Sequence, residues 1–186
     1  MQNQIHENVQ VGFNFKIGHF CVIEEGVIIG NNARIENFVE IQKGLLIGNN
    51  VWIRSYARIG AYNRIEDYAV IKCAAITGPK TIIKKEAFIG PQVIMTSDHI
   101  LTQETRTVVD ERVFIGAGTI LLPNIHIGAG AIIGAQSFVN KDCEAGRVYV
   151  GSPIRKRTSD DVWPGKVIVR DTMEKCPTCG KLILRR

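Results

Sequence analysis

The sequence predicts an all-β protein, a triangular parallel β-helix, and three regular features of its 186 residues support this. An aliphatic residue recurs every six positions from Val11 to Ile89 and again from Val109 to Val139, with Thr77 as the exception. The fifth place of each six-residue unit is usually small or apolar, and the second place is often glycine. A period of six fits neither the 3.6-residue helix nor the two-residue strand, so the chain must turn once per unit.

Each unit is expected to form a short flat strand and a tight corner, with three units to a coil. Each aliphatic side chain then stacks on the one about eighteen residues later, as in other short-period β-helices. The repeats give about seven coils and a prism roughly 32 Å long, at about 4.8 Å between neighbouring strands. Glycine relieves crowding at the corners, and Asn31–Asn32 and Asn49–Asn50 suit them because asparagine tolerates left-handed backbone.

We predict one main domain, residues 1–157, with an inserted loop at 95–108, followed by a short C-terminal tail at 158–186. In the tail, Trp163–Gly165 suggests a turn and Lys166–Arg170 a short strand. The polar start of the chain and the lack of about eighteen consecutive apolar residues predict an intracellular, cytoplasmic protein without a membrane span.

Positive charge is concentrated at the C-terminal end. Residues 1–146 have a net charge of −1 and residues 147–186 a net charge of +6. This basic segment lacks the interleaved aromatic residues of a nucleic-acid-binding module, so nucleic acid is not the expected partner. A phosphorylated small molecule fits a few clustered basic groups better.

The interruption at Met95–Val108, with the sequence MTSDHILTQETRTV, is the expected place for chemistry. An insertion into a repeat protein often forms a binding loop. His99 lies in this segment, and imidazole is the natural general base near neutral pH. The other histidines, His6, His19 and His126, are expected to be solvated surface residues.

The segment VFIGAGTILLPNIHIGAGAIIGAQSFVNKD followed by CEAGRVYVGSPIRK, residues 113–156, resembles the signature of the hexapeptide-repeat acetyltransferases. The similarity is to the galactoside, maltose and xenobiotic acetyltransferase group, and IGPQVIMTSDH, residues 89–99, is similar to the segment that leads into their catalytic histidine. The resemblance implies a left-handed β-helix, a homotrimer, acetyl-CoA as acetyl donor, and active sites between subunits.

The same resemblance implies roles for individual residues. His99 is the expected catalytic base, oriented by Asp98, Glu104 or a backbone carbonyl, and Phe114 replaces the tryptophan of many relatives as an aromatic wall. The remaining expected acetyl-CoA contacts are small residues along the pantetheine arm, basic residues near the adenosine phosphates, and residues that shape the last turn: Ala117, Ala135, Lys141, Gly151, Pro153, Arg155 and Lys156.

The acceptor is the open part of this prediction. The helical N-terminal segment that helps form the acceptor pocket of the galactoside and maltose enzymes has no counterpart, because the repeats begin at Val11. We expect O-acetylation of a sugar or sugar-like acceptor. The alternatives are N-acetylation of a nucleotide-linked amino sugar and a non-catalytic β-helical scaffold or binding subunit. A zinc hydrolase like the carbonic anhydrases on the same prism is disfavoured, because three convergent histidines are not evident.

The tail contains Cys176-Pro177-Thr178-Cys179-Gly180, which has the form of a zinc knuckle. Two thiolates are half of a structural zinc site, so Cys176 and Cys179 would need ligands from another subunit. Free thiols or a redox-active pair are the alternatives. Cys21 and Cys143 occupy the fifth place of their units and are expected to be packing residues.

Several outward places of the repeat are apolar, which predicts a homotrimer packed along the faces of the prism. These residues are Val22, Ile28, Trp52, Val70, Ile76, Ile82, Phe88, Ile94, Ile120 and Phe138.

Overall fold

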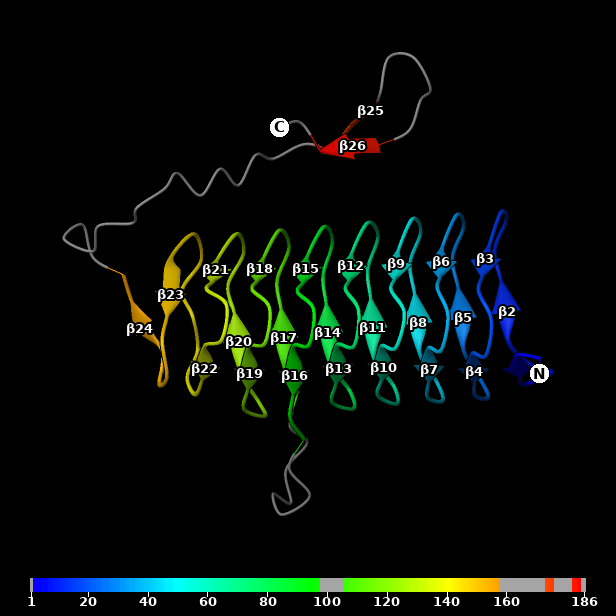
Figure 1. Ribbon diagram of the computed structural model, residues 1–186, viewed down its shortest axis with the longest axis horizontal. Helices are drawn as coiled ribbons and strands as arrows, with labels where there is room; N and C mark the ends of the chain where they lie inside the picture. Colours follow the sequence, from blue (N-terminus) through cyan, green and yellow to red (C-terminus); the bar gives the residue numbers. More distant parts are fainter. Residues whose placement is uncertain (1, 98–105, 158–172, 176–181, 185–186) are drawn as a thin grey trace.

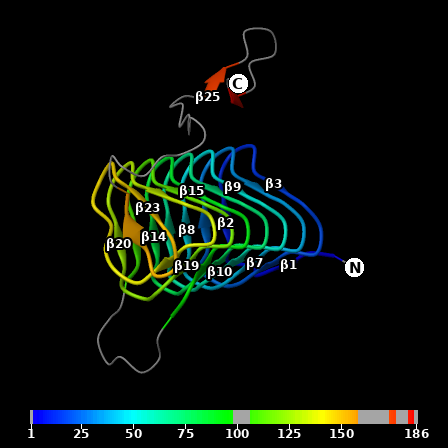
Figure 2. The same ribbon diagram turned by 60° about the vertical axis from the view of Figure 1, so that its left-hand side comes forward.

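The computed structural model describes residues 2–97, 106–157, 173–175 and 182–184, and its main body is a three-sided parallel β-helix (Figures 1 and 2). The chain visits the three faces in turn, so every third strand lies in the same sheet. The described residues contain no helix, and hence none that is long and apolar enough to cross a membrane.

Sheet A has eight strands: β1 (Gln4–Ile5), β4 (Val22–Ile23), β7 (Glu40–Ile41), β10 (Arg58–Ile59), β13 (Ile76–Thr77), β16 (Ile94–Met95), β19 (Ile120–Leu121) and β22 (Phe138–Val139). Sheet B has seven: β2 (Gln10–Val11), β5 (Ile28–Ile29), β8 (Leu46–Ile47), β11 (Arg64–Ile65), β14 (Ile82–Ile83), β17 (Val108–Val109) and β20 (His126–Ile127).

Sheet C has nine: β3 (Lys16–Ile17), β6 (Arg34–Ile35), β9 (Trp52–Ile53), β12 (Val70–Ile71), β15 (Phe88–Ile89), β18 (Phe114–Ile115), β21 (Ile132–Ile133), β23 (Val148–Val150) and β24 (Arg155–Lys156). Neighbouring strands of the three sheets are parallel, apart from β24, which pairs antiparallel with β23. In the tail, β25 (Met173–Lys175) and β26 (Leu182–Leu184) form an antiparallel pair.

The six-residue period sets which side chains enter the core. First-place residues such as Ile53 and fifth-place residues such as Ala57 are fully buried. The register Ile35↔Ile53↔Ile71 stacks one isoleucine on the next at eighteen-residue spacing, as predicted. Each such side chain contributes about 1.5–3 kcal/mol relative to an exposed one. Cys21 and Cys143 are buried and free, in agreement with their expected packing role.

The repeat begins one unit earlier than Val11. Ile5 occupies the first place in β1 and pairs with Ile23, but it is 44% exposed because β1 is the edge strand of sheet A. Polar neighbours hide this unit in the sequence. The eight strands of sheet A correspond to about eight coils, one more than the period alone suggested.

At the corners, left-handed backbone and close approach between coils occur at different places of the unit, although the sequence pattern assigned both to the corner as a whole. Positive φ occurs at the fourth place of the units, where Asn32, Tyr56 and Gly26 have φ of 56°, 64° and 69°. The second-place glycines serve close approach between coils instead. A Cβ on Gly60 would lie 2.6 Å from the backbone carbon of Gly78 in the next coil.

Candidate active site

The one long insertion of the prism joins sheet A to sheet B. β16 ends at Met95 and β17 begins at Val108, so residues 96–107 replace an ordinary corner. The predicted base His99 and its candidate orienting residues, Asp98 and Glu104, lie outside the described residues. Their roles therefore stay predictions.

The coil next to this insertion contains a break in the hydrogen-bond ladder. β13 pairs with β16 through Ile76↔Ile94 alone, whereas β16 keeps two paired residues with β19. Thr77 lies at the break, and its hydroxyl accepts from the Gly60 N–H at 3.0 Å and from the Asn63 amide at 2.6 Å. The exception to the aliphatic period is therefore a buried hydrogen-bonding residue at the base of the loop.

A ridge of small residues runs along the corner between sheets C and A. The Gln136 N–H donates to the Ala117 carbonyl at 2.8 Å, so the exposed Ala117 and Ala135 lie at equivalent positions of adjacent coils. In the next coil the Gly151 carbonyl accepts from the Phe138 N–H at 2.9 Å, and Pro153 follows through a cis peptide bond. The structure thus brings four of the predicted acetyl-CoA contacts onto one corner.

Phe114 lies on sheet C, three residues before Ala117 along the chain. Its half-buried ring stacks on Phe88 with ring centroids 4.9 Å apart and an angle of 4° between planes. It therefore provides an aromatic surface beside the ridge.

The predicted phosphate contacts come from two segments near the C-terminal end of the prism. Lys141 is exposed at the corner between sheets A and B, whereas Arg155 and Lys156 lie in β24 of sheet C, the face opposite that corner. The Lys156 ammonium lies 2.6 Å from the Glu144 carboxylate, and this contact lowers the pKa of Glu144. The Lys156 side chain thus reaches Glu144, which follows Lys141 by three residues, and the phosphate-binding role of the three cations stays a prediction.

Sequence reasoning missed a charged cluster on sheet B, next to the end of the insertion. His126 pairs in register with Val108, and its Nε2 lies 2.8 Å from Asp110 Oδ2. Lys84 Nζ lies 2.7 Å from Asp110 Oδ1. Burial opposes ionisation of Asp110, but hydrogen bonds from Lys84 and His126 outweigh it and lower its pKa. His126 is exposed, as expected, but its imidazole is oriented by a carboxylate.

The cluster could have been found from the pattern. Lys84 and Asp110 both occupy the second place of their units, and counting across the insertion makes them neighbours. The expectation for His126 treated it alone, without this neighbouring carboxylate.

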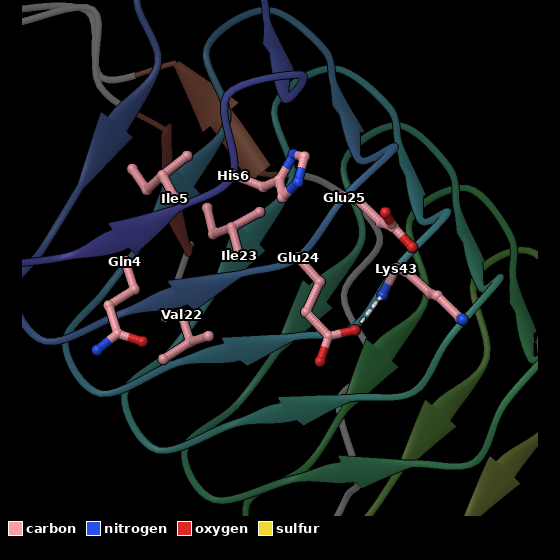
Figure 3. A pocket seen from close by; sticks show the side chains of 8 residues that line it. All are labelled: Gln4, Ile5, His6, Val22, Ile23, Glu24, Glu25 and Lys43. Carbon is pink, nitrogen blue, oxygen red and sulfur yellow. Dashed lines mark hydrogen bonds between the residues drawn. The ribbon is translucent and has the colours of Figure 1, made fainter.

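A shallow hollow of about 540 Å³ lies at the other end of the prism, around β1 and β4 (Figure 3). Ile5 and Ile23 line it with Glu24, whose carboxylate accepts from the Lys43 N–H at 2.9 Å. It is the open end of the first coil, many strands from the ridge, and we do not assign it to the candidate active site.

Metal binding has no support in the described part of the chain. No group of three or more histidine, cysteine, aspartate or glutamate side chains there is arranged to hold an ion. Cys176 and Cys179 lie outside the described residues, so the predicted knuckle stays a prediction.

The family models match the prism in two parts. A model of the GMPPB C-terminal domain matches residues 2–107. The chain belongs to this family. A model of the bacterial transferase hexapeptide (six repeats) matches residues 106–141, which include Ala117 and Ala135 of the ridge and the first part of the predicted signature. No curated protein matches the sequence.

Solved structures share the fold of this GMPPB C-terminal domain family member at low identity. The acetyltransferase domain of PglB from Neisseria gonorrhoeae FA1090, in complex with acetyl coenzyme A, is 17% identical, with a TM-score of 0.50 over 83% of this chain and 57% of that one. UDP-N-acetylglucosamine acyltransferase from Campylobacter jejuni is 17% identical, with a TM-score of 0.65 over 84% and 73%.

A hexapeptide transferase family protein from Anaplasma phagocytophilum is 19% identical, with a TM-score of 0.53 over 82% of this chain and 85% of that one. These identities establish the fold alone. The chain spans 57% of the PglB domain's length. The galactoside, maltose and xenobiotic group is not singled out by these matches.

Proposed function

We propose that the protein is an acetyl-CoA-dependent acetyltransferase that O-acetylates a sugar or sugar-like acceptor. The observation that carries this proposal is the single insertion at the corner between sheets A and B, which contains His99, together with the exposed small-residue ridge in the coils that follow. The hexapeptide transferase match over residues 106–141 supports it.

In the proposed reaction, His99 removes the proton from the acceptor hydroxyl as its oxygen attacks the thioester carbonyl of acetyl-CoA. The new C–O bond replaces the C–S bond, and coenzyme A leaves as a thiol after protonation. Ala117 and Ala135 have the small side chains that let a pantetheine arm lie against the corner. Arg155, which follows the Gly151 turn, is the proposed phosphate contact, and Lys156, which pairs with Glu144, lies next to it in β24.

Thiol release from acetyl-CoA, measured across a panel of sugars and nucleotide-linked sugars, tests this function and identifies the acceptor. Release that depends on a sugar hydroxyl is the expected result. Release that requires an amino sugar would instead favour N-acetylation.

A non-catalytic binding or scaffold domain is the second candidate. The family match favours it because the matched model describes a C-terminal domain, a part attached to a larger protein. Such a domain would release no thiol with any acceptor in the panel.

We further propose a homotrimer packed along the prism faces. Apolar side chains point outward on two faces, among them Ile94 and Ile120 of sheet A, which are 38% and 40% exposed, and Leu46 of sheet B, which is 47% exposed. A lone prism would leave this surface in water. Sedimentation equilibrium should give about three times the 20.6 kDa protomer mass. A concentration-independent protomer mass would exclude the trimer.

A further inference from the structure

Sheet C carries a group of cations in its first coils that the proposed acetyl transfer does not use. Lys16 and Arg34 occupy the outward place in β3 and β6, and Trp52 follows them in register in β9. Arg54 and Lys72 lie in the adjacent column, together with Glu36. Four cations and one carboxylate give this patch a local charge of about +3 in a domain that is otherwise close to neutral.

Two guanidinium groups of the patch lie over the same indole ring. The Cζ atoms of Arg34 and Arg54 are 5.1 Å and 4.7 Å from the centre of the Trp52 ring. Arginine stacks well on tryptophan because the ring face is electron-rich and the guanidinium is planar and weakly hydrated.

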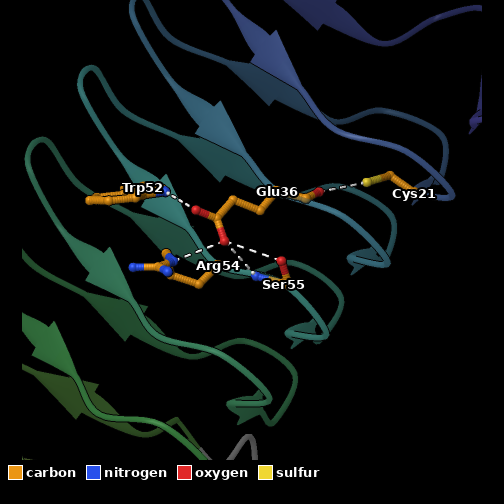
Figure 4. A network of polar contacts seen from close by, with 5 residues as sticks. All are labelled: Cys21, Glu36, Trp52, Arg54 and Ser55. Carbon is orange, nitrogen blue, oxygen red and sulfur yellow. Dashed lines mark hydrogen bonds and ion pairs between the residues drawn. The ribbon is translucent and has the colours of Figure 1, made fainter.

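The Glu36 carboxylate lies between Trp52 and Arg54 and is hydrogen-bonded to both (Figure 4). Its Oε1 accepts from Trp52 Nε1 at 3.1 Å, and its Oε2 accepts from Arg54 Nε at 2.9 Å and from the Ser55 hydroxyl at 3.1 Å. Burial opposes ionisation of Glu36, but the hydrogen bonds from Arg54 and Ser55 outweigh it and lower its pKa. The carboxylate therefore stays charged at neutral pH, and the indole and one guanidinium are held in place.

Glu36 occupies only the Nε edge of Arg54. Within residues 2–97 and 106–157, the Nη groups of Arg54 and the whole guanidinium of Arg34 have no hydrogen-bond partner. Paired guanidinium groups with unused N–H donors match the oxygens of a phosphate, which they bind bidentately.

We propose that Arg34, Arg54 and Trp52 form a binding site for the phosphate groups of a ligand, with Lys16 and Lys72 adding to the positive field. This extends the proposed function, because a nucleotide-linked sugar acceptor carries a diphosphate. β9 is three strands of sheet C before β18, so the site lies about 14 Å along the prism from Phe114, at about 4.8 Å per strand. Phosphate binding itself does not depend on acetyl transfer.

Tryptophan fluorescence gives a direct test. The chain has two tryptophans, so Trp163→Phe leaves Trp52 as the only reporter. Titration of this protein with inorganic pyrophosphate should change the fluorescence saturably, and added salt should weaken the binding. In the same background, Arg34→Gln should weaken pyrophosphate at least about tenfold, since a hydrogen bond to a charged group contributes about 1.5–3 kcal/mol.

Arg58→Gln is the matched control. It removes one exposed arginine of sheet A that pairs with Glu40, so the change in net charge is the same while the patch is intact. This variant should bind pyrophosphate as the parent does. Equal affinity in the parent and Arg34→Gln, or no response in the parent, would overturn the site.

Two further measurements distinguish a phosphate site from a carboxylate site and from a subunit contact. If glucuronate changes the fluorescence as strongly as pyrophosphate, the site binds carboxylates and the phosphate assignment is wrong. If Arg34→Gln lowers the sedimentation mass and pyrophosphate does not bind the parent, the guanidiniums form a subunit contact and the site is overturned. If the protein binds pyrophosphate but releases no thiol from acetyl-CoA with any acceptor, the phosphate site is supported and the proposed acetyl transfer is wrong.

Discussion

His99→Ala should lower kcat of acetyl transfer by about 10²- to 10⁴-fold, the usual contribution of a positioned general base. The affinity for acetyl-CoA should change little, because the proposed donor contacts lie on the ridge and at Arg155. The rate of the native protein should fall at low pH, because a protonated imidazole cannot accept the hydroxyl proton. The midpoint need not equal the ordinary histidine pKa of about 6.5. Steady-state kinetics with the acceptor from the thiol-release panel measure all three effects.

His19→Ala is the control for the loss of an imidazole. His19 is exposed at the corner after β3, and its backbone N–H, which the substitution keeps, donates to the Asn37 side chain. Its kcat should stay within about twofold of the parent, since an exposed residue away from the site has little effect. Near-native kcat in His99→Ala would mean that the base lies elsewhere or that the acceptor is an amine that arrives deprotonated.

Gly60→Ala should destabilise the prism by about 3 kcal/mol, the upper part of the range for overpacking. The added Cβ would lie 2.6, 2.7 and 2.8 Å from Gly78 C, Gly78 O and Pro79 N. All three are backbone atoms of the next coil, so no side chain can rotate away and the coils must separate. Urea unfolding should show the loss as a lower midpoint with an unchanged slope.

Gly130→Asn is the matched control, because Gly130 has a positive φ but free space around it, whereas Gly60 lies against the next coil. Its φ is +65°, but nothing lies within 4 Å of the added Cβ. Asparagine already occupies equivalent corners at Asn32 and Asn50 with φ of 56° and 57°, so this change should cost less than about 1 kcal/mol. If Gly130→Asn destabilises more than Gly60→Ala, close approach between coils is not what requires glycine at the second place.

The six-residue period predicts much of the prism. A period of six is met by a coil of three units that turns the first-place aliphatic residues inward, so the inward places, the coil of about eighteen residues and the place of the insertion follow from counting. The family match and the strand register agree with this pattern. The pattern did not predict the unit that begins at Ile5, because its neighbours in the sequence are polar and Ile5 itself is exposed.

The polar contacts near the candidate site could not be predicted from the period, because they form between residues of different coils. Thr77 looked like a flaw in the repeat, but its hydroxyl accepts from the Gly60 N–H of the preceding coil, a donor that at the equivalent Gly48 bonds to a backbone carbonyl. Lys84 and Asp110 meet because the insertion returns the chain in register, with Ile83 paired to Val109. The ion pair between Lys156 and Glu144 joins β24 to the segment that follows Lys141, a contact that the six-residue period does not predict.

Calorimetric titration with acetyl-CoA tests the central claim, that the chain is an acetyl-CoA-dependent acetyltransferase. We predict saturable binding to the native protein, weaker binding of dephospho-CoA, and weaker acetyl-CoA binding by about 1.5–3 kcal/mol in Arg155→Ala, the range for hydrogen bonds to a charged group. Equal affinity in Arg155→Ala would remove Arg155 from the phosphate contacts. A native protein that shows no saturable binding of acetyl-CoA would contradict the claim.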